Sequence, residues 1–418
     1  MDKKLITKIL AEEIKDSRGN PTIKVSVWVR DVSESFSVPS GASTGAHEAH
    51  ELRDADNKGV RLAIDKVNNI IAPKLIGQDV FGQDKIDRIM IDLDGTYNKD
   101  NLGGNSMIGV SIACAKLAAK IKEVETFEYL RTLRLGKEQA LVSIKPSRNV
   151  PYLFMNLLEG GKHAGNDLSF QEYHIVPQVE DIKEAIEIGV KVDNTLKEMI
   201  ETLGPGDAVY GDEGGFAPPT DKVRVPLQYL QEALKINNLE GKVRLALDVA
   251  SSSFFKSGLY KVDGKNILKE ELASVYDSLI KEFNLFSVED PFDEEDFESF
   301  KFLKNNHHGL IVVGDDLTVS NQILLRKALE NDSINAMIIK PNQIGTLTET
   351  LETMKLAREN NIELIVSHRG RETDDDFIAD LAFAFGCFGL KAGAPTKPER
   401  MVKYSRLIKI NNLPRLRG

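Results

Sequence analysis

Three acidic residues end short apolar runs in the second half of the sequence: Asp248 in ALDVA, Glu289 in SVEDPF and Asp315 in VVGDDL. If these runs are neighbouring barrel strands, their C-terminal ends surround one axis and the carboxylates lie close together. Such carboxylates repel one another away from water, and a divalent cation relieves the repulsion. An all-oxygen set favours Mg²⁺ over zinc. Acids here could also cap helices or form ion pairs, but three at matching strand ends favour a metal site.

Two lysines occupy the same kind of position, because Lys340 ends the run AMIIK and Lys391 ends FGLK. Near bound cations the neutral form of a lysine is favoured, which suits it to removing a proton. A lysine considered alone is better explained as the ion-pair partner of a carboxylate. Beside a Mg²⁺ site, we interpret Lys340 as a base.

Further candidates lie in polar or glycine-flanked segments: Glu213 in GDEGGFAPP, Glu172 in FQEYHIVP and His163 in GGKHAGN. Two carboxyl groups that lie close together share a proton, which raises one pKa and makes a usable acid. The residues alone do not show that Glu172 and Glu213 meet, and a single loop histidine is usually a solvated side chain. The segment 40–45, SGASTG, suits a mobile lid, although its composition alone favours an ordinary turn.

The elements expected to position these residues form a repeat in the second half of the chain. Apolar runs recur about every 25 residues from Glu289 onward, with amphipathic helical stretches between them, as in a β/α barrel. The predicted strands are 243–248, 285–289, 310–315, 336–340, 362–368 and 388–391.

The first part of the chain has a different rhythm, which predicts a smaller N-terminal α+β domain over residues 1–142 and a barrel over 143–418. Residues 21–30 alternate and are typical of a strand, with 35–39 as its hairpin partner. Residues 59–71 and 105–122 have helical spacing. The link between the domains is expected near 143–149.

Composition narrows the classes of partner. The chain has 418 residues, 41% of them apolar, a net charge of −10 and a pI of about 5.4. This balance argues against nucleic acid or an anionic membrane as the main partner. No apolar run approaches the about 18–20 residues of a membrane span. Without a signal-like N-terminus, a cytoplasmic protein is expected, with Cys114 and Cys387 as buried, reduced thiols.

Several motifs together resemble enolase, in family order and over nearly the whole chain: DSRGNPT (16–22), SGASTG (40–45), GGKHAGN (160–166, with its lead-in glycine), GDEGGFAPP (211–219), SVEDPF (287–292), GDDLTV (314–319), KPNQIGT (340–346), SHR (367–369) and ERMVKYS (399–405). The segment GGKHAGNDLSFQE resembles archaeal members. The resemblance implies a small α+β domain followed by a barrel whose first two strands are antiparallel. It also implies a cytoplasmic glycolytic and gluconeogenic lyase, phosphopyruvate hydratase, which reversibly dehydrates 2-phosphoglycerate to phosphoenolpyruvate with two Mg²⁺ ions.

The resemblance also assigns roles residue by residue. Lys340 is implied as the base at C2, with Glu213, supported by Glu172, as the acid that helps the C3 hydroxyl leave. The implied metal ligands are Asp248, Glu289, Asp315 and Ser43. The implied substrate-binding residues are Ser43, His163, Gln171, Glu172, Glu289, Asp315, His368, Arg369, Gly370 and Lys391.

Two departures from the family pattern stand out. The usual Ser-His-Arg-Ser-Gly-Glu-Thr reads here with Gly370 and Arg371, so Arg371 either contacts the substrate phosphate or points outward to the acids at 372 and 374–376. Lys24 and Lys409 cannot form the acid–base pair that joins many family dimers. A homodimer or higher homo-oligomer remains expected, because surface pairs contribute only about 0–1 kcal/mol.

Two alternative functions stay open on this basis. One is an enolase-superfamily lyase acting on another phosphorylated hydroxy acid, which the Gly370-Arg371 departure motivates. The other is a non-catalytic binding protein that keeps the fold, against which the intact Lys340 and Glu213 count.

Overall fold

The N-terminal unit is built on a three-stranded antiparallel sheet of β1 (Lys8–Lys15), β2 (Pro21–Val29) and β3 (Val32–Ser37). Alternate side chains of β2, Ile23, Val25 and Val27, are fully buried, as the alternating sequence predicted. The structure is a computed structural model and describes residues 3–41, 45–133, 147–202 and 209–413. The predicted hairpin is confirmed, whereas β1 was not expected from the sequence.

Helices cover one face of this sheet. The segment predicted as helix at 59–71 forms α1 (Arg61–Asp65), a π-helical stretch (Lys66–Ile71) and α2 (Ala72–Leu75). It is followed by α3 (Gln83–Asp94), α4 (Gly104–Ile121) and α5 (Thr126–Thr132). The buried helix α4 lies against β2 and β3. A Cβ on Gly109 would come within 2.6 Å of the Val25 side chain, so only glycine permits this close approach.

The second part of the chain is a closed barrel of eight strands in the order β10-β11-β12-β13-β14-β4-β5-β6. The six predicted strands are confirmed as β6 (Val243–Asp248), β10 (Ser287–Glu289), β11 (Ile311–Gly314), β12 (Ala336–Ile339), β13 (Glu363–Ser367) and β14 (Gly389–Lys391). The first two barrel strands, β4 (Tyr152–Glu159) and β5 (Glu172–Pro177), had not been located from the residues.

Strand β5 runs antiparallel to both of its neighbours, β4 and β6, while the remaining barrel pairs are parallel. The barrel therefore begins with an antiparallel pair, as the resemblance implied. Because β5 is reversed, its first residue, Glu172, pairs in register with the last residues of β4 and β6, Glu159 and Asp248. At this end of the barrel, the first residue of β5 therefore lies beside the last residues of its neighbouring strands.

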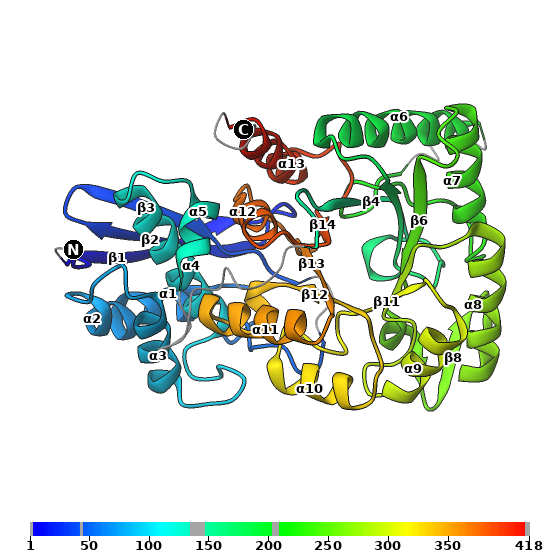
Figure 1. Cartoon of the computed structure of the whole chain (residues 1–418). Coiled ribbons are helices and arrows are strands. Elements are labelled where there is room, and N and C mark those ends of the chain that lie inside the picture. Colours follow the sequence, from blue (N-terminus) through cyan, green and yellow to red (C-terminus); the bar gives the residue numbers. More distant parts are fainter. Residues whose placement is uncertain (1–2, 42–44, 134–146, 203–208, 414–418) are drawn as a thin grey trace.

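Helices surround the barrel on its outside (Figure 1): α6 (Ile182–Glu201), α7 (Val225–Ile236), α8 (Lys269–Phe283), α9 (Phe297–Asn306), α10 (Gln322–Glu330), α11 (Leu347–Glu359), α12 (Phe377–Ala384) and α13 (Pro398–Asn411). A small sheet of β7 (Phe255–Lys256), β8 (Leu259–Val262) and β9 (Lys265–Ile267) follows β6. No helix in the described parts of the chain is long and apolar enough to cross a membrane.

The barrel interior is filled below the charged strand ends. Ala246, Val313 and Ile338 each precede a strand-end charged residue by two positions, so they face the same side one layer deeper. They belong to a separate buried cluster that includes Phe154. A Cβ on Gly389 would lie 2.6 Å from the Phe154 ring, so the ring fills the space beneath Lys391. This packed layer supports the charged groups above it.

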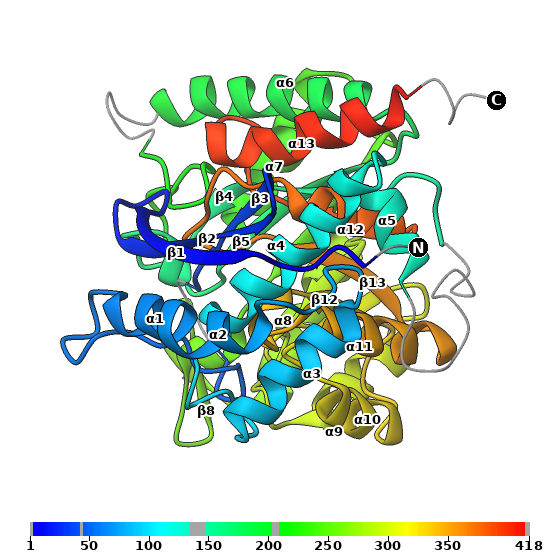
Figure 2. The same cartoon turned by 90° about the vertical axis from the view of Figure 1, so that its left-hand side faces the viewer.

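The N-terminal unit lies against the barrel, in front of it in Figure 2. The Asp87 carboxylate of α3 accepts hydrogen bonds from the Thr348 N–H (2.9 Å) and hydroxyl (2.6 Å) of α11. Lys99 pairs with Glu349 at 2.9 Å and Lys116 with Asp375 at 2.7 Å. The link predicted near 143–149 falls partly within 134–146, outside the described residues. Cys114 and Cys387 are buried and free, as predicted.

Candidate active site

The three predicted metal acids lie at one end of the barrel on adjacent strands. Asp248 and Glu289 are the last residues of β6 and β10 and are register partners, and Asp315 directly follows β11. All three are buried. The Asp290 carboxylate accepts the backbone N–H of Asp315 at 2.8 Å and of Asp316 at 2.7 Å, which holds the turn that carries Asp315.

Lys391, at the end of β14, joins these acids to β5. Its Nζ lies 2.6 Å from Asp248 Oδ2, 3.0 Å from Glu289 Oε1 and 3.3 Å from Glu172 Oε2. Burial lowers the pKa of Lys391, but the surrounding carboxylates outweigh it and hold the pKa well above its usual value. Lys391 is therefore a charged ammonium group in the middle of the acidic cluster.

Lys340, the predicted base, directly follows β12 and its Nζ contacts Asp315 Oδ2. Burial lowers the pKa of Lys340, but the Asp315 carboxylate outweighs it and the pKa is raised. The expected preference for the neutral form refers to a lysine beside bound cations and stays a prediction, whereas in this arrangement the ammonium form of Lys340 is favoured. The physical reason is the direct contact with Asp315, which stabilises the ammonium form.

The donor set at this end of the barrel fits a hard divalent cation. Asp248, Glu289 and Asp315 offer only oxygen, are buried, and stabilise positive charge, as their contacts with two lysines demonstrate. Their oxygens do not all lie within 4.8 Å of one another, and the Lys340 and Lys391 ammonium groups contact them. Two other groups in the described part of the chain meet that spacing: His163, Glu172, Glu213, and Asp290, Asp315, Asp316.

Glu172, Glu213 and His163 meet across three segments of the chain, which the residues alone could not show. His163 Nδ1 lies 3.6 Å from Glu172 Oε1 and 3.6 Å from Glu213 Oε1. Burial, with repulsion from Glu213, raises the pKa of Glu172 well above its usual value. Burial also raises the pKa of Glu213, but His368 and His163 outweigh it and the pKa is lowered. Glu172 therefore holds a proton more strongly than Glu213 here.

His368 links Glu213 to helix α13. Its Nδ1 contacts an Arg400 guanidinium nitrogen, which can only donate, and its Nε2 lies 3.1 Å from Glu213 Oε2. Burial lowers the pKa of His368 to about 4, so the ring is neutral near pH 7. A neutral ring that accepts at Nδ1 carries its proton on Nε2 and donates it to Glu213.

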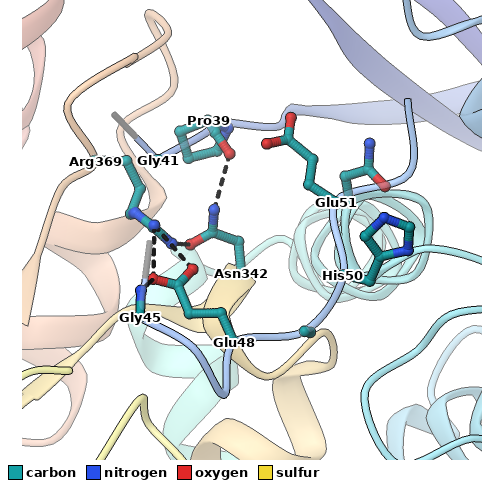
Figure 3. A pocket seen from close by; sticks show the side chains of 10 residues that line it. Pro39, Gly41, Gly45, Glu48, His50, Glu51, Asn342 and Arg369 are labelled. Carbon is teal, nitrogen blue, oxygen red and sulfur yellow. Dashed lines mark hydrogen bonds and ion pairs between the residues drawn. The ribbon is translucent and has the colours of Figure 1, made fainter. Parts of the chain in front are cut away.

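Arg369 lies in a cavity of about 310 Å³ between the barrel and the N-terminal unit (Figure 3). Its Nη2 donates to both carboxylate oxygens of Glu48, at 3.1 and 2.9 Å, and its Nη1 donates to Asn342 Oδ1 at 2.9 Å. Glu48 also accepts the Gly45 N–H at 3.1 Å. These contacts join a predicted substrate-binding arginine to the segment that follows 42–44.

The remaining predicted residues are placed as follows. Gln171 is buried immediately before β5, and its Oε1 has no hydrogen-bond partner among the described residues. The Gly370 carbonyl accepts from Arg400 Nη2 at 3.0 Å, which fixes the backbone after Arg369. Ser43 lies outside the described residues.

Arg371, the departure from the family pattern, is held through its backbone. Its N–H and carbonyl pair with Ser40, at 3.1 and 3.0 Å. Its Nε is buried without a hydrogen-bond partner, and its side chain forms no ion pair within the described ranges. Glu372 pairs with Lys403 at 2.9 Å, and Asp375 pairs with Lys116 at 2.7 Å. The outward pairing with neighbouring acids is therefore not found for the described residues.

Sequence reasoning missed several residues that support the site. Gln343 Nε2 donates to Asp315 Oδ1 at 3.0 Å, and Arg400 holds the segment 368–370 through three of its residues. Gln343 lies in the motif KPNQIGT and Arg400 in ERMVKYS, so both residues belonged to recognised motifs but had been given no role. Glu159 is the last residue of β4, as Asp248 is of β6. Because β4 was not located from the residues, Glu159 was not considered. No sequence pattern pointed to Glu48, because its partner Arg369 lies 321 positions away in the chain.

Comparisons with known proteins agree with this geometry. Residues 147–414 match the family described as "Enolase, C-terminal TIM barrel domain", and residues 6–130 match "Enolase, N-terminal domain". An enolase from Methanocaldococcus jannaschii is 45% identical over 412 residues, covering 97% of this chain and 94% of the relative. Enolases from Methanopyrus kandleri and Pyrococcus furiosus are each 44% identical, covering 97% of this chain and 95% and 94% of the relatives. With both domains matched and nearly the whole chain aligned, the chain belongs to the enolase family.

Proposed function

We propose that the chain carries out the enolase reaction, the reversible dehydration of 2-phosphoglycerate to phosphoenolpyruvate, and is thus a phosphopyruvate hydratase, a lyase. The observation that carries this proposal is the convergence of two lysines, three strand-end acids and the group of His163, Glu172 and Glu213 at one end of the barrel. Removal of a proton next to a carboxylate, with loss of a hydroxyl from the adjacent carbon, needs a base and an acid in one such place.

Lys340 is proposed as the group that takes the C2 proton. Glu213, with Glu172 and His163, is proposed to assist departure of the C3 hydroxyl, because the two carboxyl groups and the imidazole already meet. Shared protons between neighbouring carboxyl groups are a common source of an acid near neutral pH. Proposed substrate contacts come from Ser43, Gln171, Glu289, Asp315, His368, Arg369, Gly370 and Lys391.

Asp248, Glu289 and Asp315 are proposed to hold Mg²⁺, and Ser43 a second Mg²⁺. When bound, these ions supply positive charge for the extra negative charge that develops on the substrate carboxylate, as is known for this superfamily. The chain itself contributes the buried carboxylate oxygens. Asp290 and Gln343 hold Asp315 in place through hydrogen bonds. Lys340 and Lys391 add positive charge beside these carboxylates.

We also propose a division of the chain at 142/143 into an N-terminal capping domain and the barrel domain, a homo-oligomeric assembly and a cytoplasmic location. The different architectures of the two parts support the division. Lys24 pairs in register with Glu12 and Ser37 within the N-terminal sheet, so a dimer would need other contacts than the family's acid–base pair at this position.

The deciding experiment follows phosphoenolpyruvate by its ultraviolet absorbance after 2-phosphoglycerate and Mg²⁺ are added. Turnover of about 1–1,000 per second would support the proposal. No turnover, together with activity on another phosphorylated hydroxy acid, would instead support the alternative lyase. No activity on any of these substrates would favour a binding protein. A Lys340→Ala preparation is the matched blank, because it retains any contaminating activity.

A further inference from the structure

Glu159 is a buried carboxyl group that the proposed reaction does not use. It ends β4, has an exposed fraction of 0%, and faces the segment that carries Glu213. Its Oε1 accepts the backbone N–H of Gly215 at 2.6 Å, and both oxygens lie 3.2 Å from the backbone N–H of Glu213. One side chain therefore holds the main chain on both sides of Gly214.

Residues next to the Glu159 carboxyl group leave space for it and connect the neighbouring loops. A Cβ on Gly211 would lie 2.2 Å from Glu159 Oε2, so only glycine leaves room for the carboxyl group there. Lys397 Nζ donates to the Gly211 carbonyl at 3.0 Å from the other side. Asn166 Nδ2 donates to the Glu159 carbonyl at 3.0 Å and ties the His163 loop to the same strand end. The contacts join the two loops that carry Glu213 and His163.

The electrostatic surroundings couple Glu159 to Glu213. Burial, followed by repulsion from Glu213, raises the pKa of Glu159 to about 8. The two N–H hydrogen bonds and the charge of Arg400 act in the opposite direction but are outweighed. Other charged or titratable groups also lie near this segment: Glu172, His163, His368, Lys391, Lys397, and the pair of Arg18 with Asp212. The neutral form of Glu159 is therefore favoured, and its ionisation at higher pH would place a second negative charge facing Glu213.

We infer that Glu159 is a positioning residue for Glu213, holding the 211–215 segment in place and linking its position to pH through a direct carboxyl–backbone contact. While neutral, it orients the Glu213 main chain without repelling the Glu213 carboxylate. Once ionised, it repels that carboxylate and displaces it from Glu172 and His163. This inference rests on the proposed role of Glu213 at the reacting centre.

Two substitutions separate the positioning and the charge. Glu159→Leu removes the acceptor, so kcat is expected to fall at least about tenfold with KM within about threefold, since small displacements of reacting groups have such effects. Glu159→Gln keeps an oxygen that can accept both N–H groups, so kcat near pH 7 should stay within about twofold of the parent. In the parent, kcat should decline as pH rises through about 8, and Glu159→Gln should abolish that inflection.

The matched control is Asp193→Asn, which neutralises a buried acid on α6 and should leave the pH profile of kcat unchanged. Gly211→Ala provides an independent route, because its methyl group would displace the Glu159 carboxyl group, and it should reproduce the fall in kcat. If Glu159→Leu does not fold, the pH profile of Glu159→Gln alone decides. An inflection that persists in Glu159→Gln, or an unchanged kcat in Glu159→Leu, would overturn the inference.

Failure of the inference and failure of the proposed function can be distinguished. If Glu213→Gln does not reduce turnover of 2-phosphoglycerate, the role proposed for Glu213 is wrong and with it the basis for Glu159. If Glu213→Gln inactivates the enzyme but the Glu159 variants behave as the parent does, only the Glu159 inference is wrong.

Discussion

Charged side chains at the charged end of the barrel contact partners from other elements. Asp248 meets Lys391, Asp315 meets Lys340, and Glu213 meets His368. Because these groups are buried, removing one partner leaves the other as an uncompensated charge or an unpaired polar group. Each substitution at this end should therefore change activity through the partner that it leaves unpaired.

Lys340→Ala removes the proposed base. We expect kcat to fall at least about 100-fold, since general acid–base groups contribute about 10²–10⁴-fold. Exchange of the C2 proton with deuterated solvent should be lost in parallel, which separates proton removal from later steps. Lys281→Ala, an exposed lysine on α8, is the control and should behave as the parent. Retained exchange in Lys340→Ala would show that another group is the base.

Arg371→Ser tests whether this cation contacts the substrate phosphate. Its side chain has no ion-pair partner within the described ranges, so a phosphate would supply a charge-assisted contact. We expect KM to rise about tenfold, consistent with the strength of such contacts, and its dependence on salt to weaken. The exposed Arg326→Ser is the control. If both affinity and salt dependence stay unchanged, Arg371 does not contact the phosphate.

At the scale of elements, strand direction decides which residues share the site. The reversed β5 places Glu172, its first residue, in register with the last residues of β4 and β6. A parallel β5 would instead have placed this residue at the opposite end of the barrel. On the outside of the barrel, α6 carries a buried carboxyl group that affects stability.

Helix α6 contains the buried Asp193, whose Oδ1 has no hydrogen-bond partner within the described part of the chain. Burial raises the pKa of Asp193 from 3.8 to about 7, and Lys197 only partly offsets this. The folded state therefore binds a proton that the unfolded state releases between about pH 4 and pH 7. In that window this group reduces the free energy of unfolding by up to about 1.4 kcal/mol per pH unit as pH rises.

Asp193→Asn should remove this dependence. Relative to the parent, the variant should gain stability as pH rises from 5 to 8, because it has no carboxyl group to ionise. Urea unfolding followed by circular dichroism at several pH values measures the difference. Asp181→Asn, the exposed N-cap of the same helix, is the control and should not reproduce this trend. Parallel pH profiles for Asp193→Asn and the parent would contradict the assignment.

At the scale of the whole molecule, the N-terminal unit completes the charged end of the barrel. Glu48 reaches Arg369 across 321 positions, and Ser40 pairs with the backbone of Arg371. The buried contacts of α3 and α4 with α11 hold the two parts together. The site is therefore a property of both parts and not of the barrel alone.

Removal of divalent metal should abolish turnover without unfolding the chain. After dialysis against EDTA, activity on 2-phosphoglycerate should be lost, and Mg²⁺ should restore it and raise the thermal unfolding midpoint, because ligands that bind the folded state stabilise it. Asp248→Asn should need more Mg²⁺ for half-maximal activity. The control is Asp92→Asn on the outer helix α3. Full activity in EDTA would contradict the proposed metal site.

The strands that ended in charged residues could be predicted from sequence, because an apolar run that ends in an acid or a lysine is typical of a barrel strand that reaches a polar site. The runs at 243–248 and 336–340 became β6 and β12 with the predicted residues at one end. Strands β4 and β5 were missed from the residues, since their polar and histidine positions interrupt the apolar pattern. The family resemblance supplied the antiparallel start.

The sequence by itself determined the family, the barrel and the chemical types at its charged end, because these depend on local patterns and long motifs. Only the tertiary structure decided which groups touch: Lys391 among three carboxylates, Lys340 on Asp315, and Glu159 beneath the Glu213 segment. Contacts between residues far apart in sequence depend on strand direction and packing depth, which no local pattern encodes. The pKa values follow from those contacts, so they too were decided by the tertiary structure.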